Sequence, residues 1–240
     1  MTKRYSVITR ISIGLLSFFA GVVSTEIVEV KGAIAAPDPI FNPVLTEIRQ
    51  KMPEEWSIRL PSNFSRNNPA WYADRIRFQD RSFFISIVWQ PGCQGERLCT
   101  AGSIVSSSLN DDPYATRLLS EPLFTESDMA KVWKIRERLS KKSTPLSESE
   151  QNLLVRANSH PVISRAPITL KPGVKGMVIF TQGNGTVAAG NLHVVWEQES
   201  FIYRLSFNAG DPKSPRTQKD RANLINVAIS MAKELPIESN

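Results

Sequence analysis

The feature that most constrains the fold is a pair of alternating apolar segments joined by a short polar turn. Residues 72–78 and 83–89 flank the turn at 79–82, and the second segment reads FFISIVW. Successive side chains of a strand point to opposite faces, so one face of this strand carries Phe83, Ile85, Ile87 and Trp89. Branched and aromatic residues favour strands. The pattern predicts an antiparallel β-hairpin whose apolar face must be covered by other parts of the chain.

A second β region is predicted in the C-terminal third. Short strands are expected at 168–170 and 177–181, and residues 183–185 (Gly-Asn-Gly) form a strong turn signal. Residues 192–196 alternate, and 197–200 are polar and turn. The partner strand then lines one face with Phe201, Tyr203, Leu205 and Phe207. We therefore expect a second antiparallel hairpin here.

Helical patterns lie before, between and after the two β regions. Apolar spacing predicts helices over 44–51, 125–142 and 148–157, the last two with capping pairs at their N-termini. A final helix is expected to begin near Thr217, and its apolar stripe comprises Leu224, Val227, Ala228, Met231 and Leu235. Such a stripe is typical of a helix docked on a sheet.

Shorter segments complete the prediction. Residues 56–60 alternate and predict a strand, 103–107 predict another, and 109–124 read as a loop. The fold class is therefore α+β, with antiparallel β-hairpins packed by helices, a helical middle segment and a C-terminal helix docked on the sheet.

The domain organisation is expected to be a signal peptide at 1–35 and a single α+β domain at 36–240. The two hairpins, FQDRSFFISI and WEQESFIYRL, share a Ser-Phe after the turn. This leaves open an alternative of two sheet-and-helix halves, 54–124 and 162–240, joined by helices within 125–158.

The N-terminus has the order of charges and apolar residues found in secretory signals. Lys3, Arg4 and Arg10 precede an uncharged run at 11–24, and Ala33-Ile34-Ala35 provides small residues for cleavage after Ala35. The run is shorter than the roughly 20 apolar residues that span a bilayer. An uncleaved N-terminal anchor is the alternative. We expect an exported protein of the periplasm, the thylakoid lumen or the extracellular space.

The two cysteines are Cys93 and Cys99, in WQPGCQGERLCTAG. Two cysteines six positions apart in an exported chain predict a disulfide across a hairpin loop, which stabilises by roughly 2 kcal/mol in the chain-entropy model. A redox or metal site is the alternative, but the spacing is not C-x-x-C and the histidines, His160 and His193, are distant in sequence. We expect no metal site and no cofactor.

The sequence contains none of the catalytic motifs that we searched for. There is no G-x-S-x-G, S-x-x-K, phosphate loop or dinucleotide fingerprint, so no catalytic residue is assigned. The net charge of +6 falls to +4 without residues 1–35. Together with export, so mild a charge predicts that nucleic acid is not a partner.

One segment carries a concentration of basic residues, KVWKIRERLSKK at 131–142. With its apolar residues it predicts a basic amphipathic helix for an anionic membrane surface or an envelope or lumenal protein partner. An ordinary helix with a solvated basic face is the alternative reading. The candidate contact residues are Lys131, Trp133, Lys134, Arg138, Lys141 and Lys142.

Several segments resemble pieces of uncharacterised exported bacterial α+β proteins, cyanobacterial ones among them. These are EEWSIRLP, the Cys-containing hairpin, and the hairpin bearing Trp196 and Tyr203 with the following helix NLINVAISM. The arrangement resembles the sheet-and-helix sandwich of the PsbP and Mog1 type. The resemblance implies a fold and carries over no functional residue.

Export, a disulfide and a sheet without catalytic motifs predict a non-enzymatic binding or accessory protein of the periplasm or lumen. Two alternatives stay open. One is an exported hydrolase whose site is assembled from residues distant in sequence, and the other is a peripheral membrane protein that uses the basic helix 131–142.

Overall fold

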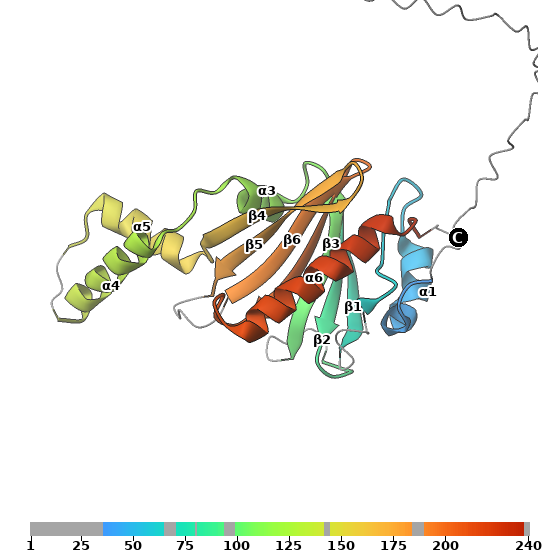
Figure 1. Cartoon of the computed structure of the whole chain (residues 1–240), viewed down its shortest axis with the longest axis horizontal. Helices are drawn as coiled ribbons and strands as arrows, with labels where there is room; N and C mark the ends of the chain where they lie inside the picture. Colours follow the sequence, from blue (N-terminus) through green and yellow to red (C-terminus); the bar gives the residue numbers. More distant parts are fainter. Residues whose placement is uncertain are drawn as a thin grey trace, which may run out of the picture. The chain divides into compact units, whose positions relative to one another are not determined.

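A computed structural model describes residues 36–64, 71–79, 81–93, 99–141, 145–183 and 190–237 (Figure 1). The predicted signal at 1–35 and most of the predicted turn at 183–185 lie outside these residues. Ile34–Asn240 forms one compact unit.

The α+β prediction is confirmed, because an antiparallel sheet packs against helices. The strands are β1 (Tyr72–Gln79), β2 (Ser82–Val88), β3 (Thr100–Ser108), β4 (Val162–Lys171), β5 (Val174–Gln182), β6 (Gly190–Gln198) and β7 (Phe201–Ala209). The helices are a 3-10 turn η1 (Pro39–Phe41), α1 (Asn42–Lys51), α3 (Pro113–Ser120), α4 (Glu126–Lys141), α5 (Glu148–Asn158) and α6 (Pro215–Lys233).

Both β regions belong to one seven-stranded sheet with the order β1-β2-β3-β7-β6-β5-β4. The pairing of β3 with β7 joins them, in a register that runs from Gly102 opposite Phe207 to Ser108 opposite Phe201. Gly102 suits this pairing, since a Cβ there would collide with the Ser206 carbonyl oxygen and the Phe207 ring. The close approach of β7 to β3 therefore requires glycine at this position.

The two faces of the sheet are covered differently. Helix α6 crosses one face, while α3 lies behind the strands in Figure 1. The α6 face holds the main core, where the rings of Trp196 and Tyr203 stack with centroids 5.2 Å apart. Ile202 points to the other face and packs beneath Leu118 of α3. The alternation predicted for residues 201–207 is thus confirmed.

The C-terminal helix docks as predicted but starts earlier. Ser214 is its N-cap and accepts a hydrogen bond from the backbone N–H of Thr217, with Pro215 in the first turn. The predicted stripe is buried from Leu224 to Met231, whereas Leu235 lies beyond the helix and is exposed. The stripe therefore ends with the helix.

Residues 56–60 do not form the predicted strand. They contribute only an isolated bridge between Ile58 and Ile237. Ile58, Arg59 and Leu60 are all buried, although a strand lying on a sheet would turn every second side chain away. The alternation of apolar and polar residues at 56–60 therefore does not reflect one buried and one exposed face of a strand.

The segment 109–124 is not the loop that the sequence suggested, because it contains helix α3. The Asp112 carboxylate accepts a hydrogen bond of 2.8 Å from the backbone N–H of Ala115, and Pro113 occupies the first turn. An Asp-Pro pair is a turn signal, but it also suits the N-cap and first position of a helix. Burial of Leu118 against the sheet favours the helix.

The two middle helices and their capping pairs are confirmed. Thr125 and Asp128 exchange hydrogen bonds at the start of α4, and Ser147 and Glu150 form a capping box at the start of α5. The helices lie side by side in Figure 1 and share a small core of Phe124, Val132 and Ala157.

The turn between β6 and β7 is conformationally strained. Glu199 and Ser200 have φ angles of 55° and 67°, which non-glycine residues adopt at a cost. Two-residue hairpin turns of this kind usually contain Asn-Gly. The Glu199 carboxylate accepts a 2.6 Å hydrogen bond from buried Arg59, and the Ser200 carbonyl accepts one from the backbone of Leu109. These contacts hold the turn in place.

We predict that Ser200→Gly raises the free energy of unfolding by about 0.5 to 1 kcal/mol, because relief of the left-handed strain exceeds the entropic cost of glycine. Urea unfolding followed by circular dichroism measures this change. Ser200→Ala keeps the Cβ and is the matched control, for which no gain is expected. Equal stability of the Gly and Ala variants would contradict the strain.

Candidate functional site

An aromatic cleft of about 500 Å³ lies between the N-terminal half of α6 and the adjoining ends of β6 and β7. Trp71 stacks on Phe207 with ring centroids 5.0 Å apart and planes 8° from parallel. Trp89 meets Trp71 edge-on at 5.2 Å and is 42% exposed. The cleft therefore presents one open indole beside a stack that is already packed. Its further apolar lining comprises Phe64, Leu192, Leu224 and Val227.

The opposite wall of the aromatic cleft is polar and comes from α6. Arg216, Asp220 and Asn223 follow at i, i+4 and i+7, which places them on one flank of the helix. Thr217 and Leu224 are buried beside them and hold the helix on the sheet. Within the residues that the structure describes, none of the three polar side chains makes a hydrogen bond or ion pair. A guanidinium, a carboxylate and an amide thus face the aromatic wall and can form hydrogen bonds with a ligand.

The loop after β2 positions Trp89. Its backbone N–H donates a 2.9 Å hydrogen bond to the Cys99 carbonyl. Cys93 and Cys99 form the predicted disulfide, with Cα atoms 6.1 Å apart. The Asn208 amide donates to the Thr100 carbonyl at 2.8 Å and ties β7 to the same loop end. The disulfide therefore closes the loop that leads away from the exposed tryptophan.

No protein-family model, curated protein or solved structure matches this chain. The resemblance to sandwiches of the PsbP and Mog1 type accordingly rests on the residue pattern given above. The function must be argued from the chemistry of the site.

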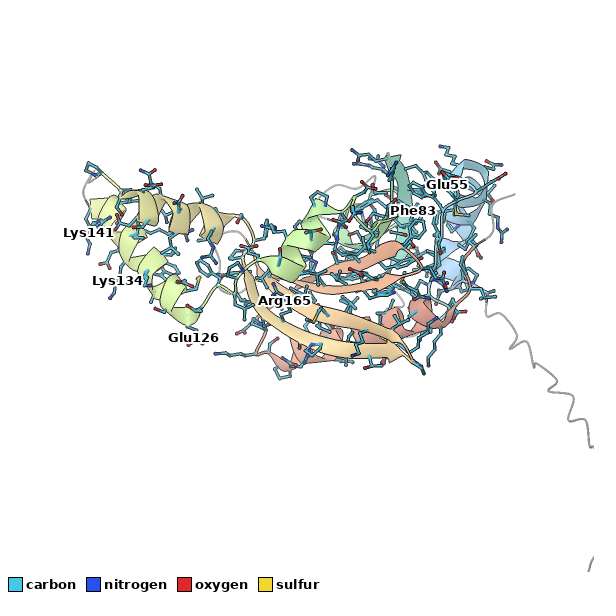
Figure 2. The ribbon with its side chains drawn as sticks, turned by 90° about the horizontal axis from the view of Figure 1, so that it is seen from above. Glu55, Phe83, Glu126, Lys134, Lys141 and Arg165 are labelled. Carbon is cyan, nitrogen blue, oxygen red and sulfur yellow. A yellow bond between two sulfur atoms is a disulfide. The ribbon has the colours of Figure 1, made fainter. Side chains whose placement is uncertain are left out.

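The basic residues predicted for membrane or partner contact lie on α4, and Lys142 falls outside the described residues. Lys131, Lys134, Arg138 and Lys141 recur at i, i+3, i+7 and i+10 and share one side of the helix. Figure 2 shows Lys134 and Lys141 along the same helix. Trp133 is 52% exposed and lies about 80° or more around the helix from this basic side, at 100° for each residue.

Acidic partners offset much of the charge on this side of α4. Arg138 pairs with Glu150 at 2.7 Å and Lys141 with Glu137 at 2.5 Å. The apolar side of the helix, with Val132 and Ile135, is buried. Membrane binding by an interfacial helix needs an apolar side that can enter the lipid. In this chain the apolar side of α4 is buried against other residues of the protein. Contact with a membrane or a partner protein stays a prediction.

Among the residues described, no helix is both long and apolar enough to cross a membrane. The same residues contain no group of three or more His, Cys, Asp and Glu side chains placed to hold a metal ion.

His193 and Ser206 form a hydrogen-bonded pair on the α3 face of the sheet. The distance from His193 Nδ1 to the Ser206 hydroxyl is 2.8 Å, and Nε2 lies 3.1 Å from the Thr181 hydroxyl. A serine beside a histidine is the arrangement expected of the alternative hydrolase. The electrostatics of the pair decide whether it can act in that way.

Burial, together with smaller contributions from the nearby Arg204 and Arg117, which repel a positive charge, lowers the pKa of His193 to about 3. A general base works best with a pKa near the operating pH. Both ring nitrogens lie against hydroxyl groups, and the buried carboxylate of Asp112 binds Arg204 at 3.1 Å. The imidazole therefore serves as a neutral link between β5, β6 and β7.

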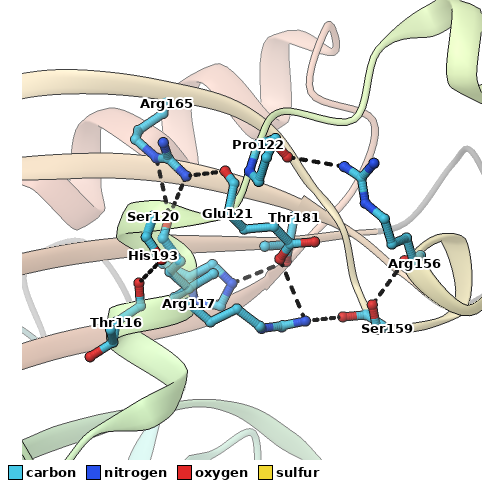
Figure 3. Close-up of polar contacts among 11 residues, drawn as sticks. Thr116, Arg117, Ser120, Glu121, Pro122, Arg156, Ser159, Arg165, Thr181 and His193 are labelled. Carbon is cyan, nitrogen blue, oxygen red and sulfur yellow. Dashed lines mark hydrogen bonds and ion pairs between the residues drawn. The ribbon is translucent and has the colours of Figure 1, made fainter. Parts of the chain in front are cut away.

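Arginine side chains fasten α3 to its surroundings (Figure 3). Arg165 of β4 donates to the backbone carbonyls of Leu118 and Glu121, and Arg117 donates to the Ser159 carbonyl at 2.6 Å. Carbonyl groups at the end of a helix need such donors. These contacts cap α3 and fix it over the buried histidine.

The aromatic cleft was missed in the sequence because its residues come from segments spread between Phe64 and Val227. Trp71 and Trp89 flank the first hairpin, and Phe207 lies near the end of β7. Polar residues at helical spacing on α6 were the available signal. In the sequence these α6 residues indicate only an exposed side of a helix. Their place in a cleft depends on the neighbouring ends of β6 and β7.

We predict that stability falls with acid in a manner that depends on His193. The unfolded state binds a proton near pH 6.5 and the folded state only near pH 3, so the stabilisation is complete above pH 6.5 and is lost as the pH falls. Between pH 6.5 and 5 the free energy of unfolding should drop by about 1 kcal/mol per pH unit.

His193→Gln tests this assignment, because an amide can bond to both hydroxyl groups and cannot be protonated in this range. Urea unfolding at several pH values should give a flatter slope for the variant between pH 6.5 and 5. An unchanged slope would mean that another group causes the acid sensitivity.

Proposed function

We propose that this chain is an exported binding protein whose aromatic cleft holds a ring of a neutral saccharide. The observation that carries the proposal is the exposed indole of Trp89 opposite three uncommitted polar side chains of α6. Apolar pockets with a few converging polar groups are the usual form of small-ligand sites.

The chemistry of a sugar ring matches both walls of the aromatic cleft. The C–H faces of a pyranose are apolar and pack flat on an aromatic ring, and its hydroxyl groups point outward from the ring edge. Each hydroxyl both donates and accepts hydrogen bonds. Arg216 supplies donors, Asp220 supplies acceptors and Asn223 supplies both.

The charges of this wall favour a ligand without net charge. Arg216 and Asp220 carry opposite charges one helical turn apart, so their fields largely cancel for a ligand that spans both. Among the lining residues that the structure describes, Asp220 is the only carboxylate, whereas glycoside cleavage generally uses two. The lining thus supports binding of a saccharide and not its hydrolysis.

The export part of the proposal is supported by the N-terminal sequence pattern and by the disulfide. Disulfides persist in oxidising compartments such as the periplasm and the cell exterior. Glycans are abundant outside the cytoplasm, so the proposed ligand class agrees with the proposed location.

We predict that Trp89→Ala weakens saccharide binding about tenfold, since loss of one ring stack costs about 1 to 1.5 kcal/mol. Asp220→Asn should weaken it as well by removing a charged acceptor. Isothermal titration calorimetry with a panel of neutral oligosaccharides of β-linked and α-linked glucose and N-acetylglucosamine measures both effects.

The matched control is Trp133→Ala, which makes the same change at an exposed tryptophan on α4, away from the aromatic cleft. This control should bind as the unaltered chain does. Absence of binding to every saccharide at millimolar concentration would overturn the proposal, as would equal losses in the two tryptophan variants.

A further inference from the structure

A second cavity, of about 550 Å³, lies on the face of the sheet opposite α6. The register places one residue from each of four neighbouring strands in a single row across its floor. Arg77 of β1 is opposite Phe84 of β2, Phe84 is opposite Val105 of β3, and Val105 is opposite Arg204 of β7. The row has two apolar residues in the middle and an arginine at each end. We call this site the arginine pocket.

Arg77 and Arg204 line the cavity from the two ends of the row. Adjacent strands are about 4.8 Å apart, so three spacings separate the ends by about 14 Å. Because both arginines line the cavity, a ligand of this length can lie between their guanidinium groups. Arg81 adds a third guanidinium from the turn between β1 and β2, and Asp111 and Asp112 form the wall before α3.

The carboxylates of the arginine pocket are committed to protein groups. Asp112 accepts the Ala115 backbone N–H with one oxygen and Arg204 Nε with the other. Asp111 lies 3.8 Å from Arg81, at the limit of an ion pair. In the part of the chain that the structure describes, Arg77 is exposed and has no hydrogen bond or ion pair. The pocket thus has positive charge and N–H donors to spare.

Arg204 is held in place without using all of its donors. Its guanidinium lies 4.8 Å from the centre of the Tyr114 ring, and Nη1 donates to the Ser206 hydroxyl at 3.1 Å. With Asp112 on Nε, these contacts fix the orientation of the group, and Nη2 makes no hydrogen bond with any described residue. A fixed donor loses little entropy when it binds a ligand.

We propose that the arginine pocket binds a small organic oxyanion, with its carboxylate or phosphate groups on Arg77 and Arg204 and its apolar body on Phe84 and Val105. Guanidinium groups recognise carboxylate and phosphate through paired hydrogen bonds. Because its floor is apolar, the pocket should favour an organic anion over an inorganic one. The site is independent of the aromatic cleft, because it lies on the other face and shares no described lining residue with it.

Isophthalate is a suitable probe, since it carries two carboxylates on an aromatic ring, and inorganic sulfate is the comparison. Calorimetric titration of the full chain at low salt should detect isophthalate and give at least tenfold weaker binding of sulfate. Arg77→Gln should weaken isophthalate binding at least tenfold. Phe84→Ala should weaken it for isophthalate but leave sulfate unchanged.

Arg49→Gln is the matched control, because it removes the same charge from an exposed position on α1 and should leave binding unchanged. Trp89→Ala should also leave it unchanged, which separates this site from the aromatic cleft. Arg77 is exposed, so folding of its variant is expected and is checked by circular dichroism. Equal effects of the Arg77 and Arg49 variants, sulfate binding as tight as isophthalate, or no isophthalate binding at millimolar concentration would each overturn the proposal.

Discussion

The pairing of β3 with β7 is the contact on which the rest of this structure depends. It joins strands about one hundred positions apart in sequence and merges two hairpin regions into one sheet. Bringing segments this far apart together costs chain entropy. Burial of apolar side chains where β3 meets β7 must offset that cost. Gly102 allows the seam to close, since any larger residue would collide with β7.

Both candidate sites form across this seam. Phe207 on β7 stacks on Trp71, which in turn meets Trp89 after the first hairpin, and this row of rings creates the aromatic cleft. Three residues earlier on β7, Arg204 lies on the other face and completes the row that begins at Arg77, which creates the arginine pocket. Because neighbouring residues of a strand face opposite sides, one strand supplies an aromatic wall to one face and a cation to the other.

Buried polar groups specify how helices and loops pack on this sheet. Arg59 is buried and binds Glu199, and Asp112 is buried and binds both Arg204 and the start of α3. Such groups are costly to bury unless they are paired, so each tolerates only arrangements that keep its partner. The strained turn at Glu199 and Ser200 is one example, because the hydrogen bond from Arg59 to the Glu199 carboxylate holds the turn in its conformation.

The local elements could be predicted from the residue pattern, because their signals lie within a few residues. Alternation identified both hairpins, the capping pairs at Thr125 and Ser147 identified α4 and α5, and the spacing of Cys93 and Cys99 identified their bond. That prediction failed where a local signal was ambiguous. Asp112-Pro113 suits a turn as well as a helix start, and the alternation at 56–60 concealed three buried neighbours.

Long-range packing sets which strands are neighbours, and therefore which side chains share a pocket. Trp89 and Asp220 are far apart in sequence, and so are Arg77 and Arg204, and no periodicity links the members of either pair. Their proximity follows from the β3–β7 register and from the docking of α6, which minimise exposed apolar surface over the whole chain. Local residue patterns fix the elements, whereas the burial of the whole chain sets the sites.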